Sequence, residues 1–426
     1  MAWTWKKLRR KPASHDARRR RTQCRSAETV RSTGSVVAAA LVFALAACST
    51  PTAESVDPAP VQSAGSAPAP EGFERGEIVS SMLLGQVDIG VAYLGATATK
   101  IVYRTTDGVT GGGTQTSGTV FVPNGSAPPG GWPIVSVGHG TTGVTDECAP
   151  SLYPNLLGTI GLVTPFLERG TVVVVTDYQG LGTPGDPAYL DRDAAAYDVI
   201  DAVRAARNVV PDVGTRWGAV GTSQGGQAVW AAAERNENYG DGLQLVGAAA
   251  LSPTADLTRF FAPETEQSVP RQLLVPYLYE GLRTADPSAE RSDYIRGTFA
   301  DNVTALTACS DLLGFSKADA GAVLDPADAL PDSEEASDRM RRWLESEALP
   351  TTRTGVPLFV LVGERDDLID PRWTRDAVAR ACALGDDVEL RFEPEQGHAE
   401  LAANGIGVDW LVERFLNVPT STTCAR

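Results

Sequence analysis

The sequence predicts an α/β fold in which helices cover both faces of a mostly parallel sheet and a helical cap is inserted into the sheet domain. Short apolar, β-rich runs alternate with helical patterns from residue 98 onward, as is typical of parallel strands buried on both faces. Between about residues 253 and 350, helix-like runs follow one another without a convincing strand, which predicts the cap.

Eight apolar runs are the expected strands, with helices between several of them. The runs are residues 101–103, 118–122, 133–137, 171–176, 217–220, 245–251, 357–362 and 388–392. The clearest core helix is residues 193–209, where apolar side chains recur at helical spacing. The expected cap helices are residues 271–283, 292–308 and 335–348.

We divide the 426 residues into four parts. They are an export signal (residues 1–47), a tether rich in Pro, Ala and Ser (48–71), the α/β core (72–252 and 351–426) and the helical cap (253–350). Ligands of open α/β sheets bind outside the carboxyl ends of the strands, so we expect the cap to lie over that edge.

The export signal combines basic runs at residues 6–11 and 18–21 with an apolar run at residues 36–47. That run is too short for a membrane-spanning helix, which needs roughly 20 residues. It ends in Leu45-Ala46-Ala47-Cys48, which resembles the bacterial lipobox. We therefore expect an exported lipoprotein, anchored to the cell membrane through lipidated Cys48 on its extracytoplasmic side. The alternative is an ordinary signal peptide with a chance cysteine.

Charge argues against nucleic-acid partners. Residues 1–47 hold 11 Lys and Arg and 2 Asp and Glu, which leaves 26 basic and 51 acidic residues and a net charge of −25 for the remainder. Such a body repels nucleic acid and gains nothing from anionic headgroups. A neutral lipid or small ester fits better as the partner, and we expect a monomer.

Four cysteines remain beyond Cys24 and Cys48, and an even number in an exported chain suggests two disulfides. Three pairings are possible, of which we prefer Cys148 with Cys309 and Cys382 with Cys424. Each would close a long loop, which stabilises by about 4 kcal/mol in the chain-entropy model. A metal site is the weaker interpretation because no Cys-x-x-Cys spacing is present, and no cofactor is expected.

The pattern Gly221-Thr222-Ser223-Gln224-Gly225 lies between an expected strand and an Ala-rich helix. Glycines at both ends allow a sharp turn that exposes the serine hydroxyl at the helix N-terminus. The pattern alone is common in a chain with 42 glycines, but its placement favours a nucleophile elbow. Ser223 is the candidate nucleophile.

A serine nucleophile needs a base, and the chain has only three histidines. His15 lies in the export signal and His139 follows an early strand, where an acid and a nucleophile to partner it are missing. His398 follows the last expected strand and is expected to open the final helix, so we assign it as the base. With His398 as the base, His139 is expected to be an orienting residue. The alternative for His398 is a solvated loop histidine.

Three aspartates compete for the acid that orients the base. Asp366 is preferred because it stands three residues past Gly363, the glycine that ends a strand. Asp367 is expected in solvent, and Asp370 is expected to cap a helix that starts at Pro371. The oxyanion of the acyl-transfer intermediate needs N–H donors as well. We assign these to Gln224 and to Thr141 or Gly140, with Thr141 preferred.

Four motifs together make the chain look like the secretory lipase family of the α/β-hydrolase superfamily. They are Gly138-His139-Gly140-Thr141, Cys148-Ala149-Pro150-Ser151, the six residues from Asp177 to Gly182, and Gly221-Thr222-Ser223-Gln224-Gly225-Gly226. The resemblance covers nearly all of residues 72–420 and departs from the fungal members at the N-terminus. It implies a Ser223–Asp366–His398 triad, a cap that shapes an acyl-chain tunnel, and the two disulfides preferred above.

The expected activity is hydrolysis of carboxylic, acylglycerol-type esters by a lipase or esterase through an acyl-Ser223 intermediate. Two alternatives stay open. The same acyl enzyme could pass its acyl group to an alcohol in the cell envelope, as an acyltransferase. A degenerate hydrolase fold could instead bind lipid without catalysis.

Overall fold

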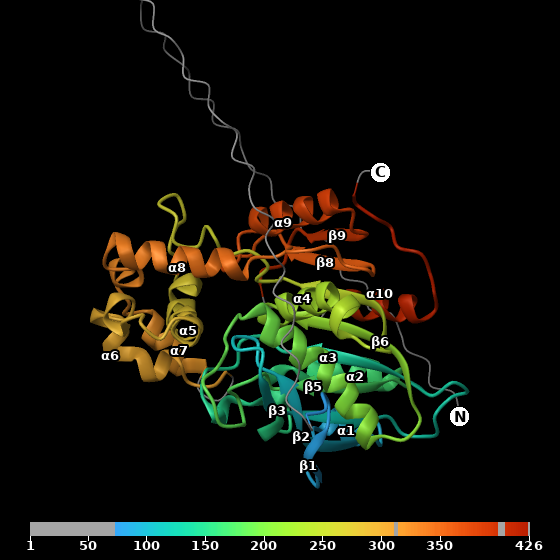
Figure 1. Cartoon of the computed structure of the whole chain (residues 1–426). Coiled ribbons are helices and arrows are strands. Elements are labelled where there is room, and N and C mark those ends of the chain that lie inside the picture. The colour runs from blue at the N-terminus through green and yellow to red at the C-terminus, as the bar shows by residue number, and fades with distance from the viewer. Residues whose placement is uncertain (1–72, 311–313, 399–404, 425–426) are drawn as a thin grey trace, which may run out of the picture. The chain divides into compact units, whose positions relative to one another are not determined.

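The computed structural model describes residues 73–310, 314–398 and 405–424, and its centre is a nine-stranded sheet (Figure 1). The strands are β1 (Ile78–Leu83), β2 (Thr97–Thr106), β3 (Gly113–Val122), β4 (Trp132–Gly138), β5 (Val172–Thr176), β6 (Val213–Thr222), β7 (Gln244–Leu251), β8 (Leu358–Gly363) and β9 (Val388–Glu393). They lie in the order β1-β2-β3-β5-β4-β6-β7-β8-β9. The pairs from β1 to β5 are antiparallel, and all pairs from β5 to β9 are parallel.

The predicted fold class is confirmed, and β2 to β9 coincide with the eight predicted runs apart from their ends. The sequence analysis missed β1. This edge strand is exposed along nearly its whole length, so its residues Ile78–Leu83 show no buried apolar face. By contrast, every residue of β5 is buried, as expected of a parallel strand covered on both sides.

Helices cover both faces of the sheet, because successive strand residues point to opposite sides. Val172 and Val174 of β5 pack with α3 (Arg192–Val209), α4 (Gln224–Tyr239) and α9 (Pro371–Leu384). Val173 and Val175 pack with the helices of the other face, which are α1 (Ile89–Tyr93), α2 (Ile160–Glu168) and α10 (Ile406–Phe415).

Residues 253–350, which we call the cap, lie between β7 and β8. The described residues of the cap form no strand. They form α5 (Val269–Ala285), α6 (Gly297–Leu306), α7 (Gly314–Gly321) and α8 (Glu334–Glu347), with short 3₁₀ turns at Arg291–Asp293 and Pro326–Ala329. These helices group beside the sheet (Figure 1) and bury their own apolar cluster, which includes Phe260, Phe299 and Met340. Trp373 of α9 belongs to this cluster and joins the cap to the core.

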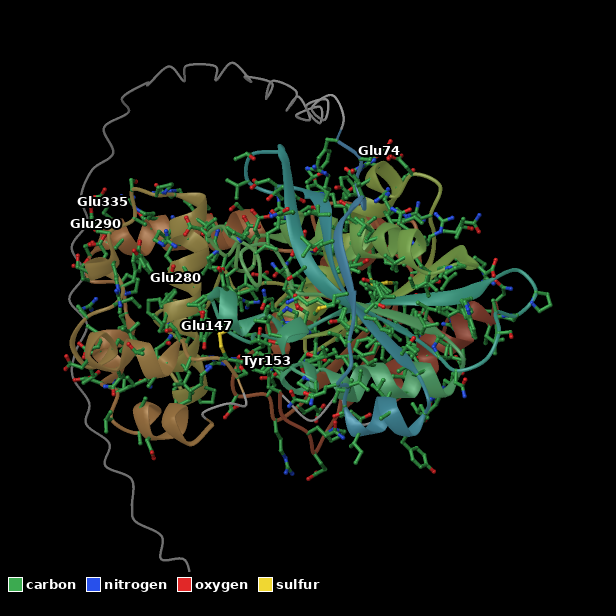
Figure 2. The ribbon with its side chains drawn as sticks, turned by 90° about the horizontal axis from the view of Figure 1, so that it is seen from below. Glu74, Glu147, Tyr153, Glu280, Glu290 and Glu335 are labelled. Carbon is green, nitrogen blue, oxygen red and sulfur yellow. A yellow bond between two sulfur atoms is a disulfide. The ribbon has the colours of Figure 1, made fainter. Side chains whose placement is uncertain are left out.

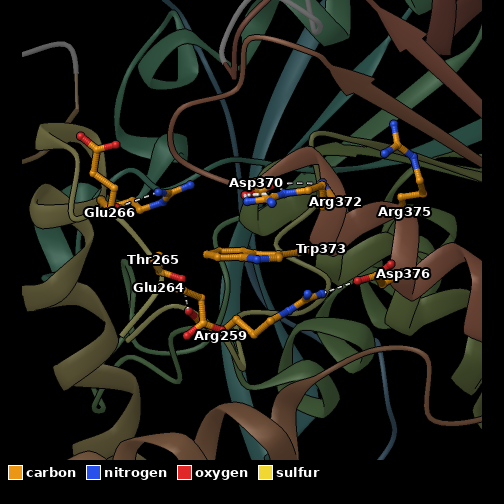
Figure 3. Close-up of a pocket in the computed structure, with 10 residues that line it drawn as sticks. Arg259, Glu264, Thr265, Glu266, Asp370, Arg372, Trp373, Arg375 and Asp376 are labelled. Carbon is orange, nitrogen blue, oxygen red and sulfur yellow. Dashed lines mark hydrogen bonds and ion pairs between the residues drawn. The ribbon is translucent and has the colours of Figure 1, made fainter. Parts of the chain in front are cut away.

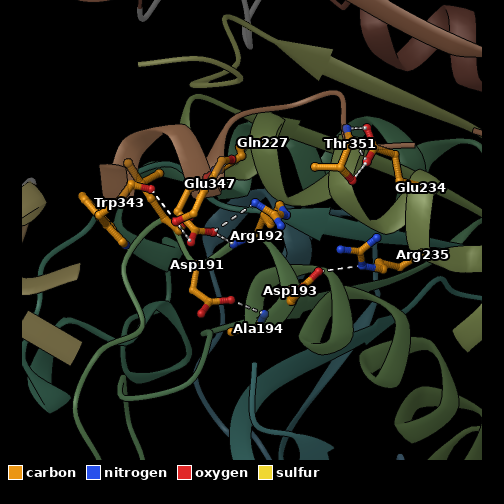
Figure 4. A network of polar contacts seen from close by, with 12 residues as sticks. Asp191, Arg192, Asp193, Ala194, Gln227, Glu234, Arg235, Trp343, Glu347 and Thr351 are labelled. Atoms are coloured by element: carbon orange, nitrogen blue, oxygen red, sulfur yellow. Dashed lines mark hydrogen bonds and ion pairs between the residues drawn. The ribbon is translucent and has the colours of Figure 1, made fainter. Parts of the chain in front are cut away.

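The C-terminal end of the cap is fastened to helices α3 and α4 by polar contacts (Figure 4). The carboxylate of Glu347 accepts a hydrogen bond from the Arg192 N–H at 3.0 Å, and the Gln227 amide donates to the Glu347 carbonyl at 3.3 Å. Just beyond, the Thr351 N–H donates to the buried Glu234 carboxylate at 3.0 Å. These bonds satisfy polar groups that the cap would otherwise bury unpaired.

Exposed acidic side chains occur on the core, as with Glu74, and on the cap, as with Glu290. Figure 2 labels five of them on one face: Glu74, Glu147, Glu280, Glu290 and Glu335. This distribution agrees with the strongly negative charge of the sequence beyond its basic start.

Asp191 at this junction should make stability depend on pH. Burial and the neighbouring Glu347 raise the pKa of Asp191 from 3.8 to about 7. The folded chain therefore keeps a proton that the unfolded chain releases, so stability is lost as the pH rises from about 4 to about 7. Asp191 also caps α3 through the Ala194 N–H at 2.7 Å, and asparagine can keep that bond.

We expect Asp191→Asn to stabilise the chain at pH 8 by about 4 kcal/mol relative to its effect at pH 4, from about 1.4 kcal/mol per pKa unit. Denaturant unfolding at both pH values measures this difference. Exposed Asp301→Asn is the matched control for the removed charge. An Asp191→Asn effect that is the same at both pH values would contradict the assignment.

Candidate active site

The predicted site residues meet at the carboxyl edge of the parallel strands. His139 follows β4, Ser223 follows β6, Asp366 follows β8 and His398 follows β9. Parallel strands end at the same edge of a sheet, so side chains far apart in the sequence converge there.

Ser223 occupies a strained turn between β6 and α4. Its backbone has φ 58° and ψ −120°, a conformation that residues with a side chain rarely adopt. The Ser223 N–H donates to the Leu251 carbonyl at 2.9 Å, and the Ser223 carbonyl accepts from the Gln227 N–H at 3.1 Å. Backbone bonds to β7 and within α4 therefore hold the turn in place.

Three glycines allow the end of β4 to touch the first turn of α4. A Cβ atom at Gly225 would lie 2.0 Å from the Gly138 carbonyl oxygen, and one at Gly221 would lie 2.2 Å from the Gly225 carbonyl oxygen. A Cβ at Gly138 would lie 2.9 Å from that same Gly225 oxygen. Only glycine fits such backbone contact, so the glycines admit β4 as well as forming the turn.

Ser223, His398 and Asp366 form one hydrogen-bonded chain. The His398 Nε2 lies 2.9 Å from the Ser223 Oγ, and the His398 Nδ1 lies 2.7 Å from the Asp366 Oδ2. The other Asp366 oxygen accepts from the N–H groups of Leu368 at 3.0 Å and Ile369 at 2.8 Å. A carboxylate at Nδ1 favours a proton on that nitrogen, which leaves Nε2 to accept the serine proton.

The two rival aspartates are occupied elsewhere. Asp367 is exposed, and its carbonyl accepts from the Ser268 hydroxyl at 2.8 Å. Asp370 caps α9 by accepting from the Arg372 N–H at 2.9 Å, and the Arg372 guanidinium beside it lowers the Asp370 pKa. His398 lies after β9. Residues 399–404 lie outside the described residues, so the expectation that His398 opens a helix stays a prediction; α10 begins at Ile406.

The predicted oxyanion donors lie around the serine. Gly140 and Thr141 line the same cavity as Ser223 and His398, and a Cβ at Gly140 would lie 3.8 Å from the Ser223 Cβ. Gln224 is the first residue of α4, whose leading N–H groups have no partner within the helix. The donor roles of Gln224, Thr141 and Gly140 remain predictions that this placement favours.

The loop after β4 is braced from the cap by Ser310, a residue that the sequence analysis missed. Its hydroxyl donates to the Thr141 carbonyl at 2.9 Å, and its N–H donates to the Thr142 carbonyl at 2.7 Å. Ser310 follows Cys309, which is disulfide-bonded to Cys148. The neighbouring cysteine was the only signal in the sequence, and it carried no hint of these hydrogen bonds.

His139 lies beneath this loop, where both ring nitrogens face carbonyl oxygens. Nδ1 is 2.6 Å from the Gly140 oxygen and Nε2 is 3.1 Å from the Asp177 oxygen. Burial lowers the pKa of His139, which favours the neutral ring. The contact with Gly140 fits the orienting role expected for this histidine.

The other motif residues support the same loop. The buried Asp177 carboxylate accepts hydrogen bonds from Ser117 and from the Ser151 N–H at 2.8 Å, while burial raises its pKa. Cys148–Cys309 and Cys382–Cys424 are both disulfide-bonded, so the expected pairing is present. The candidate lipidation residue, Cys48, lies outside the described residues.

A cavity of about 650 Å³ opens onto the Ser223 hydroxyl. Its walls come from the core loops, the start of α2 and the cap. Most wall side chains beyond the catalytic end are apolar: Leu157, Leu162, Pro270, Leu273, Leu274, Leu306 and Leu368. Lys317 of α7 also lines the cavity. An apolar cavity with a few polar groups at one end suits an ester with an extended acyl chain.

A second, charged hollow of about 490 Å³ surrounds Trp373 (Figure 3). Two of its arginines pair with acidic side chains, Arg259 with Asp376 and Arg372 with Asp370. None of the three predicted triad residues lines it, whereas Ser223 and His398 line the cavity described above. Within the described ranges, the structure holds no group of three or more His, Cys, Asp or Glu side chains that could bind a metal ion.

Known proteins share both sequence and fold with this chain. The secretory lipase family model matches residues 159–292. A probable inactive lipase of Mycobacterium tuberculosis is 27% identical over 82% of this chain and 81% of its own length. Lipase A of Arthroderma benhamiae is 24% identical over 79% of this chain and 73% of its own length. The closed-state structure of Candida antarctica lipase A aligns with a TM-score of 0.66 at 18% identity, covering 83% of this chain and 85% of that one.

None of the helices in the described part of the chain has the length and apolar character needed to cross a membrane.

The contact between β4 and α4 predicts that one methyl group added at Gly225 lowers the stability of the chain. We expect Gly225→Ala to lower stability by about 2 kcal/mol or more, because its Cβ would meet the Gly138 carbonyl oxygen at 2.0 Å and backbone cannot move aside cheaply. Thermal unfolding measures the loss. Gly355→Ala is the matched control, since no atom lies within 4 Å of its Cβ position. Equal melting temperatures for the two variants would contradict the contact.

Proposed function

Because the secretory lipase family model matches residues 159–292 of this chain and its fold is that of α/β-hydrolase lipases, we propose that it is a secretory lipase that hydrolyses acylglycerol-type carboxylic esters through an acyl intermediate on Ser223. The observation that carries the proposal is the hydrogen-bonded chain Ser223–His398–Asp366 at the mouth of an apolar cavity. The relatives support a lipase-type hydrolase. The geometry of Ser223, His398 and Asp366 supports the serine mechanism.

In the proposed reaction, the Ser223 Oγ attacks the ester carbonyl carbon while His398 Nε2 takes the hydroxyl proton. Asp366 stabilises the imidazolium that forms. Backbone N–H groups of Gln224 and of Thr141 or Gly140 receive the negative charge on the carbonyl oxygen. His398 then protonates the leaving alcohol, and a water activated by the same histidine releases the acid and restores Ser223.

The second candidate function is lipid binding without catalysis, and one finding favours it. The relative from Mycobacterium tuberculosis bears the name of a probable inactive lipase. This chain retains a serine, a histidine and an aspartate in hydrogen-bond contact, which supports the proposal that it is an active hydrolase. Acyl transfer to an alcohol would use the same acyl enzyme, and product analysis with glycerol present separates it from hydrolysis.

Variants of the triad test the proposed mechanism. We expect Ser223→Ala to abolish labelling by a fluorophosphonate and turnover of p-nitrophenyl esters. Asp366→Asn should lower kcat by about 10⁴-fold, because the histidine loses the carboxylate that fixes its tautomer. Asp367→Asn is the matched control and should stay close to the unsubstituted chain. Retained turnover in Ser223→Ala would rule out the serine mechanism.

We also propose that the chain is exported and anchored through lipid on Cys48, with residues 49–71 as a tether. The relationship to secretory lipases and the two disulfides support export. The Leu45-Ala46-Ala47-Cys48 pattern supports the anchor.

Cys48→Ala tests the anchor in a bacterial host. We expect the variant to move from the membrane fraction to the soluble or medium fraction, because the proposed attachment to the membrane is the lipid on Cys48 and alanine cannot carry it. Fractionation followed by immunoblotting measures this, with Cys24→Ala as the matched control. An unchanged membrane fraction for Cys48→Ala would refute lipid anchoring at this residue.

A further inference from the structure

The turn that follows Asp366 is held by the cap at the start of α5. The Ser268 hydroxyl donates to the Asp367 carbonyl at 2.8 Å, and the Arg271 Nε donates to the Leu368 carbonyl at 3.0 Å. The next residue, Ile369, buries its side chain in the apolar cluster of the cap. Residues 367–369 therefore contact the cap in succession, directly after the proposed acid of the triad.

The same turn holds the Asp366 carboxylate. The N–H groups of Leu368 and Ile369 donate to one Asp366 oxygen at 3.0 and 2.8 Å, and the other oxygen lies 2.7 Å from the His398 Nδ1. A carboxylate fixed by two backbone donors takes its orientation from the backbone that carries them. Movement of this turn would therefore move the acid relative to His398.

Arg271 is suited to joining this turn to α5. Its side chain is only 8% exposed, and its guanidinium donates to two backbone carbonyls, those of Leu368 and of Glu266 at 2.7 Å. The guanidinium carbon lies 5.2 Å from the centre of the Trp373 ring. A buried charge is tolerated only when it is hydrogen-bonded, and the rigid fork of an arginine can reach two carbonyls at once.

The position of Arg271 separates it from the substrate cavity. Pro270, Leu273 and Leu274 of the same helix line the cavity at Ser223, whereas Arg271 lines the charged hollow around Trp373. A substitution at Arg271 therefore tests the contact with the acid turn without removing a side chain from the cavity wall.

We propose that Arg271 is a positioning residue for the triad. By holding the Leu368 carbonyl, it keeps the Asp366 carboxylate directed at His398. The inference rests on the proposed ester hydrolysis and gives the cap a part in placing the acid, besides shaping the cavity. Arg271 contacts none of the three triad side chains, so its effect on the reaction passes through the turn after Asp366.

The first test substitutes Arg271→Met in the full chain and measures hydrolysis of p-nitrophenyl acetate and octanoate. Rates are expressed per site labelled to completion by a fluorophosphonate, which corrects for unfolded protein. We expect kcat to fall at least about ten-fold for both esters while KM changes less than about two-fold, because a small displacement of a catalytic group lowers the rate steeply.

Three further variants complete this comparison. Arg271→Lys keeps the charge and one donor, so it should restore part of kcat. Arg259→Met, which removes a cap arginine paired with Asp376 in the same hollow, is the matched control and should leave kcat unchanged. Ser268→Ala removes the neighbouring bond to the turn and should lower kcat in the same way, which keeps the proposal testable if Arg271→Met does not fold.

A double-mutant cycle distinguishes positioning of the acid from a general structural role. In an Asp366→Asn background, Arg271→Met should lower kcat by less than about two-fold, because its effect depends on the carboxylate that has been removed. Equal losses in both backgrounds would overturn the proposal. A loss confined to the octanoate ester, or to KM, would overturn it as well, since either would assign Arg271 to the cavity wall.

Hydrogen exchange separates this proposal from the proposed reaction. The amide hydrogens of Leu368 and Ile369 should exchange faster in Arg271→Met than in the unsubstituted chain, and Arg259→Met should leave them unchanged. If the unsubstituted chain hydrolyses no ester, the proposed reaction fails while faster exchange still supports the placement of this turn by Arg271. Unchanged exchange of both amides in Arg271→Met would overturn that placement.

Discussion

The placement of Ser223 beside the loop after β4 depends on backbone contact between the end of β4 and the first turn of α4. Gly138, Gly221 and Gly225 lack the Cβ atoms that would force these segments apart, so the Gly138 carbonyl lies directly against Gly225. This approach sets the loop of Gly140 and Thr141 beside Ser223. The same contact therefore brings the proposed nucleophile and the predicted oxyanion donors together.

The cap contributes to the site as well as covering it. At one end, Cys309 and Ser310 bind the loop after β4 by a disulfide and two hydrogen bonds. At the other end, Glu347 joins the starts of α3 and α4. Cap residues such as Tyr277 and Lys317 complete the cavity wall, so the core holds the proposed triad while the cap shapes the cavity that opens onto it.

The sequence predicts the sheet and the convergence of Ser223, Asp366 and His398 because both follow from local patterns. Buried parallel strands are continuous apolar runs, and the motif residues stand at strand ends. With only three histidines in the chain, the choice of His398 needed little else.

The features that the sequence analysis missed have no such local signal. The edge strand β1 has no buried face, and Ser310 acts through contacts with residues more than 160 positions away. Lys317 and Tyr277 meet only because α5 and α7 fold against each other. Tertiary packing decides each of these.

A crystal structure of the chain with a phosphonate bound covalently to Ser223 tests the central claim most directly. The account predicts that the phosphonyl oxygen lies within hydrogen-bond distance, about 2.7–3.1 Å, of the N–H groups of Gln224 and of Thr141 or Gly140. His398 should stay between Ser223 and Asp366. A phosphonyl oxygen turned away from both N–H groups, or an adduct on another residue, would contradict it.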